Sequence, residues 1–234
     1  MNKESFKQEL VNLGLEVSNE KVDLLENFML ETLKANESIN LTAIKDKDKF
    51  WELMILDSAY PLKYLDYKGK KVIDIGTGAG YPGMVMATLS DAEFTLLDAT
   101  KKKVNFFSNY ADEHKYPNIK PVCARAEEFA REHREEYDIA VARAVADLPI
   151  LLELTIPLLK VDGYFIALKG SKGLEELEKS RIALDKLGAV VEQVDEYQLP
   201  ESKEKRINIV IKKIKKTSPK YPRDYSVIIN NTLK

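Results

Sequence analysis

Residues 70–83 have the sequence KKVIDIGTGAGYPG, which indicates the kind of fold that the chain adopts. The apolar run up to Ile75 predicts a short buried strand, and the glycines from Gly76 to Gly83 predict a tight turn before a helix. Glycine lets a ligand approach backbone N–H groups, so this combination is typical of a nucleotide cradle. Pro82 fits the first helical turn, where its missing N–H is harmless.

The glycine turn contains a G-x-G-x-x-G pattern at Gly78, Gly80 and Gly83, which alone is a weak signal for a dinucleotide. The acid Asp74 lies two residues before Gly76. A carboxylate at the end of the strand would repel a pyrophosphate, whereas it suits a ligand with a cationic amino-acid end. The turn therefore favours a nucleoside cofactor with such an end.

The chain on both sides of this turn alternates between strands and helices. Further strands are expected at 93–98, 119–123, 137–142, 164–168, 190–199 and 207–214, and helices at 82–90, 101–115, 125–133, 147–160 and 173–187. This alternation predicts a mostly parallel sheet with helices on both faces. Because no helix separates the last two strands, we expect the last strand to run antiparallel to its neighbour.

Residues 1–66 have a helical pattern and predict an N-terminal helical cap, part of one compact unit with the Rossmann-like domain at 67–234. Ser18 or Asn19 can cap the longest helix of this region. A later helical pattern continues to residue 65, with Pro61 near its end.

The 234 residues include 36 Lys and Arg and 38 Asp and Glu, so the formal net charge is only −2. The stretch 201–234 has ten basic and three acidic residues, a net charge of +7, and the rest of the chain has a net charge of −9. This asymmetry suggests an edge that faces a polyanion. The alternative is a solvated terminal strand whose lysines prevent aggregation.

Cysteine and histidine are scarce. Cys123 has no partner for a disulfide within the chain, and His114 and His133 are the only histidines, so we expect no metal site. Cys123 follows Val122 at the end of a predicted strand, where we expect a small buried apolar residue. The apolar runs are far shorter than the roughly 18 residues of a membrane span. We expect a cytoplasmic protein without a membrane partner.

Asp98 ends the second predicted strand. A carboxylate there can accept hydrogen bonds from both ribose hydroxyls of an adenosine, although Asp98 can instead simply cap the helix that starts near Thr100. Residues 68–214 resemble the class I S-adenosylmethionine-dependent methyltransferases, an α/β Rossmann-like class whose mostly parallel seven-stranded sheet has an antiparallel last strand. The resemblance implies S-adenosylmethionine as cofactor, with its methionine end over the Gly76–Gly80 loop and its ribose at Asp98.

The segment 142–149 follows the fourth predicted strand, where this class of enzyme orients the methyl acceptor. It lacks the Asn/Asp-Pro-Pro-aromatic motif typical of enzymes that methylate exocyclic amines. Methylation of cytosine C5 needs a cysteine nucleophile, which Cys123 does not match. A ring nitrogen such as guanine N7 has a free lone pair and needs no base, so it fits a site without an evident nucleophile or base.

Several short strings carry a closer resemblance. They are NLTAI at 40–44, LDS at 56–58, the glycine turn, LDATKKK at 97–103, RAEE at 125–128, ARAVA at 142–146, KG at 169–170 and PKYPR at 219–223. Together they resemble the bacterial small-subunit ribosomal RNA guanine-N7 methyltransferases, the RsmG or GidB family, over nearly the whole chain. The resemblance implies direct transfer, without a covalent intermediate, to N7 of a guanine in the decoding-region loop of 16S rRNA (guanosine 527 in the usual rRNA numbering).

The cofactor contacts of that family fall on Gly76, Tyr81, Ala126, Glu127 and Arg143. The resemblance implies that Ala126 and Glu127 flank the adenine. Glu127 can instead be a first-turn acid that the helix dipole favours, and the two roles are compatible.

Arg143 is the predicted catalytic residue. A lone guanidinium in an apolar stretch needs a partner, which can be the cofactor carboxylate, the RNA or Asp147. The alternative is an internal ion pair with Asp147 or Asp74. The sequence departs from the family at Met54, where a His is common three residues before Asp57, so any role of that His does not carry over.

Basic residues expected near this edge are the candidate RNA contacts, and they are Lys101, Lys169, Arg206, Lys220 and Arg223. Lys212 and Lys213 of the last strand would extend the same surface. Tyr81 and Tyr221 are candidate rings for stacking on a splayed base, whereas burial is the commoner fate of an aromatic ring. We expect a monomer whose partner is 16S rRNA, within the small ribosomal subunit or its precursor.

Other functions stay open at this point. A NAD-dependent oxidoreductase would use the shifted glycine motif, and a non-catalytic RNA-binding assembly factor would keep the pocket only for structure. The basic C-terminal edge disfavours a methyltransferase that acts on small molecules or proteins.

Overall fold

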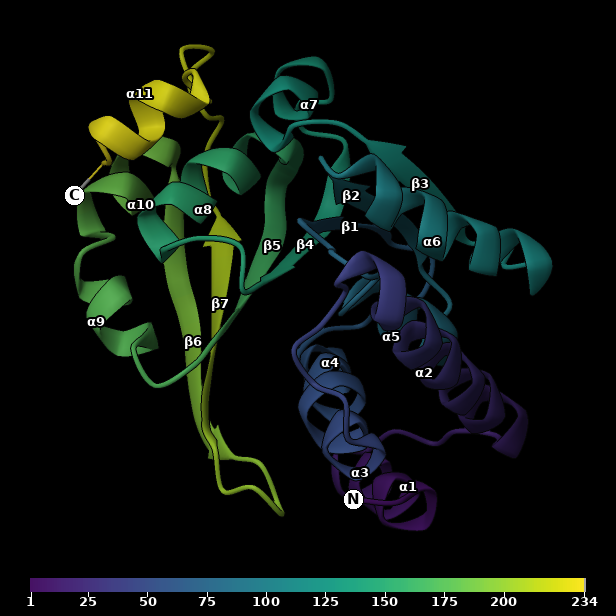
Figure 1. The fold of residues 1–234 in the computed structure, drawn as a ribbon. Coiled ribbons are helices and arrows are strands. Elements are labelled where there is room, and N and C mark those ends of the chain that lie inside the picture. Colours follow the sequence, from purple (N-terminus) through teal and green to yellow (C-terminus); the bar gives the residue numbers. More distant parts are fainter. Residues whose placement is uncertain (234) are drawn as a thin grey trace.

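The computed structural model describes residues 1–233, and Lys234, the end of the predicted second unit, lies outside the described residues. The centre of the molecule is one seven-stranded sheet (Figure 1). Its strands are β1 (Lys71–Ile75), β2 (Glu93–Asp98), β3 (Ile119–Cys123), β4 (Tyr137–Arg143), β5 (Leu159–Lys169), β6 (Ala189–Gln198) and β7 (Lys205–Lys213). The apolar runs of its central strands are buried, as is typical of a sheet that helices cover on both faces.

The strand order is β3-β2-β1-β4-β5-β7-β6. Strands β1 to β5 pair in parallel, whereas β7 runs antiparallel to both β5 and β6. This confirms the expected mostly parallel sheet with an antiparallel last strand. The dinucleotide-binding fold has a strand order of 3-2-1-4-5-6 and no inserted antiparallel strand. The topology therefore disfavours the oxidoreductase.

Strand β7 begins at the edge of the sheet where the parallel strands end. Ile207 pairs with Lys169, the last residue of β5, whereas Lys212 pairs with Tyr164. The two ends of β7 therefore lie at opposite ends of the parallel strands. The expectation that Lys212 and Lys213 extend the predicted catalytic edge was wrong, because the direction of the strand carries them away from it.

The helices that follow the strands form two layers. They are α5 (Gly83–Leu89), α6 (Lys101–Glu113), α7 (Ala126–Glu132), α8 (Leu148–Thr155), α9 (Gly173–Glu178), α10 (Arg181–Leu187) and α11 (Tyr225–Asn230). α5 and α6 cover one face together with the N-terminal helices, and α7, α8 and α10 cover the other (Figure 1). The helix expected at 173–187 is two helices, α9 and α10, and α11 was not expected from the sequence. Among the described residues, no helix combines the length and apolarity needed to cross a membrane.

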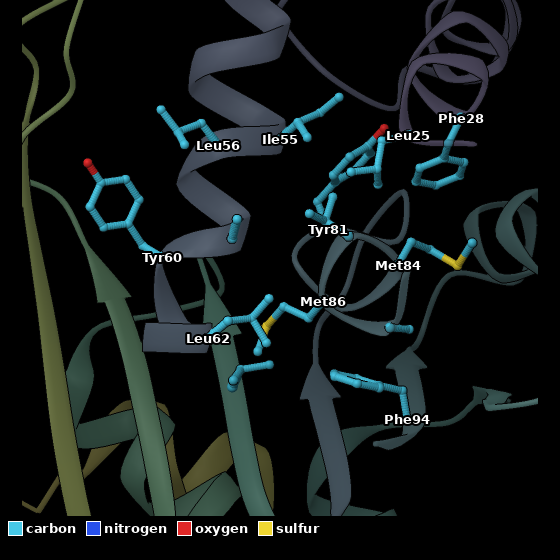
Figure 2. Packing of buried hydrophobic residues seen from close by; sticks show 14 of the residues in the cluster. Leu25, Phe28, Ile55, Leu56, Tyr60, Leu62, Tyr81, Met84, Met86 and Phe94 are labelled. Atoms are coloured by element: carbon cyan, nitrogen blue, oxygen red, sulfur yellow. The ribbon is translucent and has the colours of Figure 1, made fainter. Parts of the chain in front are cut away.

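The N-terminal region is helical, as predicted. It contains α1 (Lys3–Asn12), α2 (Asn19–Ile39), α3 (Lys47–Phe50), the π-helix η1 (Trp51–Leu56), α4 (Asp57–Ala59) and the 3-10 helix η2 (Tyr60–Lys63). Ser18 caps α2, and Pro61 lies in the last turn of the segment. Figure 2 shows Phe28 of α2 and Ile55 of η1 in one cluster with Tyr81 of the glycine turn and Met84 of α5. The N-terminal helices thus share one apolar core with the sheet.

Candidate active site

A cleft of about 800 Å³ opens where the parallel strands end. Its lining combines the glycine turn and Asp98 with Arg143 at the end of β4, Lys169 at the end of β5 and Arg206 at the start of β7. Leu53, Met54 and Asp57 of the N-terminal region also line it. Ligands of open α/β sheets bind at this edge, outside the carboxyl ends of the strands.

The glycine turn needs glycine for two different reasons. At Gly76 (φ +68°), an added Cβ would lie 2.5 Å from a methyl group of Val145, so both space and backbone conformation exclude a side chain. At Gly78 (φ +61°), a Cβ would meet no described atom within 4 Å, so only the left-handed backbone requires glycine. The backbone at Gly78 therefore faces open space in the cleft.

Asp74 lies beneath the glycine turn and is fully buried. Its Oδ2 accepts hydrogen bonds from the Thr77 hydroxyl (2.6 Å) and the Gly83 N–H (2.7 Å), and among the described residues its Oδ1 has no partner. Burial raises the pKa of this carboxyl to about 6. Asp74 is not part of the cleft lining, so the structure gives it the role of holding the turn. A direct contact with a ligand stays a prediction.

Asp98 joins the glycine turn to the next helix. Its Oδ2 accepts a hydrogen bond from the Gly78 N–H (2.9 Å), and its Oδ1 accepts one from the Thr100 N–H (2.8 Å). Both oxygens keep a free lone pair, because an ionised carboxylate has about four acceptor positions. The contact with Thr100 matches the alternative that the sequence left open, and the remaining acceptor positions suit the two hydroxyls of a ribose.

Ala126 and Glu127 start helix α7 and line a second, smaller pocket of about 170 Å³. Asp98 and Gly76 line both this pocket and the cleft. Glu127 is buried, and its Oε1 lies 3.2 Å from Nε of Arg125. The structure thus brings the predicted ribose and adenine residues together where the cleft and the smaller pocket meet.

Tyr81 lines the cleft but is only 3% exposed. Its ring stacks on Phe28 with 5.0 Å between centroids and meets the edge of Phe50, and its hydroxyl lies 3.0 Å from that of Thr32. Tyr221 is also buried, in the core on the other face. Both candidate stacking rings are core residues, which was the alternative fate considered from the sequence.

Within the protein, Arg143 pairs with neither of the acids considered from the sequence, and its contact with the cofactor or the RNA stays a prediction. Its Nη1 lies 3.5 Å from Oδ2 of Asp57 and donates to the carbonyl oxygens of Leu53 (3.3 Å) and Met54 (3.4 Å). The alternative considered from the sequence, an internal ion pair with Asp147 or Asp74, was wrong in its partner, because the N-terminal region folds back over the end of β4 and supplies Asp57. Met54, at the position that departs from the family, also places its sulfur 3.5 Å from Nη2 of Arg143.

Asp57 was not among the site residues predicted from the sequence. Its side chain is 5% exposed, and besides Arg143 it binds Nε of Arg206 (3.1 Å) and the hydroxyl of Tyr197 (3.3 Å). One carboxylate therefore orients two guanidinium groups that line the cleft. The LDS string at 56–58 marked the position without indicating its contacts.

The other predicted basic residues differ in how they relate to the cleft. Lys169 lines it, and its Nζ binds the carbonyl of Ala146 and a carboxylate oxygen of Glu176, each at 2.7 Å. Lys101 is exposed in the first turn of α6 and outside the lining, whereas Lys103, which was not selected, is part of it.

Lys220 and Arg223 lie in the C-terminal tail and do not line the cleft. Arg223 binds both carboxylate oxygens of the fully buried Glu153, at 2.8 and 2.6 Å. Lys220 lies over the ring of Tyr221, 5.1 Å from its centroid.

The expectation that Cys123 is buried was wrong, since it is exposed at the end of β3.

Comparisons with known proteins agree with this geometry. A family model described as "GidB: rRNA small subunit methyltransferase G" matches residues 21–217. Proteins named "Ribosomal RNA small subunit methyltransferase G" are similar over most of their length. That of Halalkalibacterium halodurans is 38% identical over 93% of both chains, and that of Fusobacterium nucleatum is 37% identical over 99% of this chain and 100% of the other.

Solved structures show the fold. A SAM-dependent methyltransferase from Aquifex aeolicus superposes with a TM-score of 0.56 at 16% identity, over 72% of this chain and 94% of the other. TYW2 of M. jannaschii, solved in complex with AdoMet, gives a TM-score of 0.53 at 15% identity, over 64% of this chain and 72% of the other. The fold is that of the class I Rossmann-like methyltransferases, and the chain belongs to the GidB family, the rRNA small subunit methyltransferases G.

Proposed function

We propose that this protein transfers a methyl group from S-adenosylmethionine to N7 of a guanine in the decoding-region loop of 16S rRNA. The observation that carries the proposal is the composition of the cleft. Asp98, which suits the ribose of an adenosine, lines the same cleft as the cations Arg143, Lys169 and Arg206. Family membership supplies the substrate class, since the relatives are named as methyltransferases of small-subunit rRNA.

The residues present fit S-adenosylmethionine. The free acceptor positions of Asp98 suit the ribose, the pocket at Ala126 and Glu127 suits the adenine, and the open backbone at Gly78 suits the remaining chain of the cofactor. When bound, this cofactor supplies an electrophilic methyl group on a sulfonium. Gly78, Asp98, Ala126 and Glu127 would hold the cofactor, and the part of the cleft lined by Arg143 would be left for the acceptor.

The proposed reaction asks the protein for alignment rather than for proton transfer. Guanine N7 carries a lone pair at neutral pH, so the attack needs no general base. The described residues that line the cleft include no His or Cys, and Asp57 and Glu176 are both bound to cations there. Orientation of two reactants at near-contact distance contributes about 7–11 kcal/mol to a barrier.

Arg143 is our candidate for the catalytic residue that contacts the reactants. Its side chain is 13% exposed, and Asp57 and two carbonyl oxygens fix its position. A guanidinium held in this way can donate to the O6 edge of the guanine or to the carboxylate of the cofactor. Arg206 and Lys169 would bind phosphates on either side, with Lys101 at the margin. In this account residues 1–66 act as a cap that supplies Asp57, and the protein works as a monomer.

The test is methyl transfer to small subunits that lack the modification. The protein is incubated with labelled S-adenosylmethionine and such subunits, and the labelled nucleotide is mapped. Label at N7 of one guanine in the decoding-region loop supports the proposal, and label at another nucleotide contradicts the substrate. Binding of subunits and cofactor without any transfer would favour the non-catalytic assembly factor.

A further inference from the structure

The small pocket beside Asp98 has a wall that comes from the C-terminal tail. Besides Ala126 and Glu127, its lining includes Ala99, Arg125 and Tyr225. Tyr225 begins helix α11, beyond residue 217, where the match to the family model ends. We propose that the ring of Tyr225 contacts the adenine of the cofactor, so that the C-terminal tail completes the cofactor site. This inference rests on the proposed function.

The size and chemistry of the pocket suit one flat ring system. Sites for drug-sized ligands measure about 300–1,000 Å³, so a pocket of about 170 Å³ can take only part of a nucleoside. Ala99 and Ala126 line it together with Tyr225. Because Asp98 lines both this pocket and the cleft, a ribose held there would direct its base towards Tyr225.

The tail holds Tyr225 in place. Just before Tyr225, Asp224 binds Nη2 of Arg131 on α7 at 2.6 Å, and Arg223 is paired with the buried Glu153 of α8. Three residues after Tyr225, Ile228 is fully buried. Contacts before and after Tyr225 therefore hold this part of the tail, so cofactor binding would not have to order it.

Arg125 links Tyr225 to the predicted adenine residue. Its guanidinium carbon lies 4.6 Å from the centroid of the Tyr225 ring, and its Nε lies 3.2 Å from Glu127. Arg125 is itself exposed, with 48% of its side chain accessible. Arg125 thus lies over the Tyr225 ring, and the two residues together form one side of the pocket.

The experiment compares the affinity of variants for S-adenosylhomocysteine by calorimetry. Tyr225→Ala should weaken binding at least about fivefold, the smaller end of the effect of a lost base–aromatic contact. Tyr225→Phe keeps the ring and should bind as the wild type does. Val227→Ala, on the same helix with Val227 41% exposed, is the matched control and should also leave affinity unchanged.

A second ligand separates an adenine contact from a general change in the site. 5′-Methylthioadenosine has the adenine and ribose but no amino-acid end, so Tyr225→Ala should weaken both ligands by the same factor. An unchanged affinity in Tyr225→Ala, an equal loss in Tyr225→Phe, or a loss confined to S-adenosylhomocysteine would overturn the inference. If the wild type binds neither ligand, the proposed function is contradicted as well. If the wild type binds tightly and Asp98→Ala weakens binding, the proposed function is supported whatever the result at Tyr225.

Discussion

Strand β7 carries basic residues at both ends, and the two ends lie in different environments. Arg206, at its start, lines the cleft and is held there by Asp57. Lys213, at its end, is fully buried, and its Nζ binds the carbonyl of Leu159 at 2.7 Å and Glu135 at 3.2 Å. A cation of the C-terminal tail is also bound inside the protein, as Lys213 is, since Arg223 is paired with the buried Glu153.

The comparison shows that a cluster of positive charge in the sequence mixes two kinds of residue. Residues 201–234 carry a net charge of +7, which suggested a surface for a polyanion. In the structure, some of these cations bind buried carboxylates or carbonyls, and among the described residues of this stretch Arg206 is the one that lines the cleft. Stability and activity should therefore separate when these residues are changed one at a time.

The largest expected effect is on stability, at Arg223. Arg223→Ala leaves Glu153 buried without its cation, and breaking such a pair costs about 3–5 kcal/mol of the free energy of unfolding. Denaturant unfolding measures this loss. Lys220→Ala, at an exposed residue of the same tail, should change stability by less than about 0.5 kcal/mol. Equal stabilities for the two variants would show that Arg223 is as dispensable as a surface cation.

The next effect is the pH dependence of stability that comes from Asp74, buried beneath the glycine turn. The pKa of its carboxyl is about 6 in the folded protein and 3.8 ordinarily, so between these values the folded state binds more protons. The contribution of Asp74 to stability is therefore present at low pH and decreases as the pH rises from about 4 to 6, by at most about 3 kcal/mol. The difference in stability between wild type and Asp74→Asn, followed across this range, should have that sign, and a flat difference would contradict it.

Lys213, buried at the far end of β7 from the cleft, should show the reverse pH dependence of stability. Lys213→Ala removes two polar contacts, at a cost of about 2 kcal/mol near neutral pH, whereas Lys212→Ala should cost less than about 0.5 kcal/mol. Burial lowers the pKa of Lys213, so below its ordinary 10.5 the unfolded state binds more protons than the folded state. The stability of the wild type relative to Lys213→Ala should therefore rise with pH through this window. A fall would mean that the lysine is not desolvated.

The smallest free-energy change, about 1.4 kcal/mol, is expected at Arg206 and should appear in RNA recognition. Arg206→Gln should reduce methylation of small subunits about tenfold and lower the salt dependence of RNA binding by about one phosphate contact. The affinity for S-adenosylhomocysteine should not change. Lys205→Gln, at the exposed neighbouring position, is the matched control. A loss of cofactor affinity in Arg206→Gln would place Arg206 on the cofactor side instead.

The half of the site next to the glycine turn could be predicted from the sequence because its residues lie near one another along the chain. Gly76 to Gly80 and Asp98 follow consecutive strands, and parallel strands bring their ends to one edge. The family resemblance, rather than this rule, pointed to the Ala126–Glu127 pair, which lines one pocket together with Asp98. The strand pattern likewise gave the parallel sheet and the antiparallel last strand.

The other half could not be predicted in this way because long-range contacts build it. Asp57 binds Arg143 and Arg206, which are far from it in the sequence, and only the path of the N-terminal region over the sheet brings them together. Strand pattern predicted that β7 is antiparallel, but which of its ends reaches the cleft depends on its insertion next to β5. Tyr225 lies in a helix too short to leave a clear pattern.

The most direct test of the central claim is the position of the methyl group. Methyl-deficient small subunits are incubated with the wild-type protein and labelled S-adenosylmethionine, and the modified nucleotide is mapped in 16S rRNA. We predict label at N7 of one guanine in the decoding-region loop, and a strongly reduced yield with Asp98→Ala. Label on a different nucleotide or atom, or no label at saturating cofactor, would contradict the account.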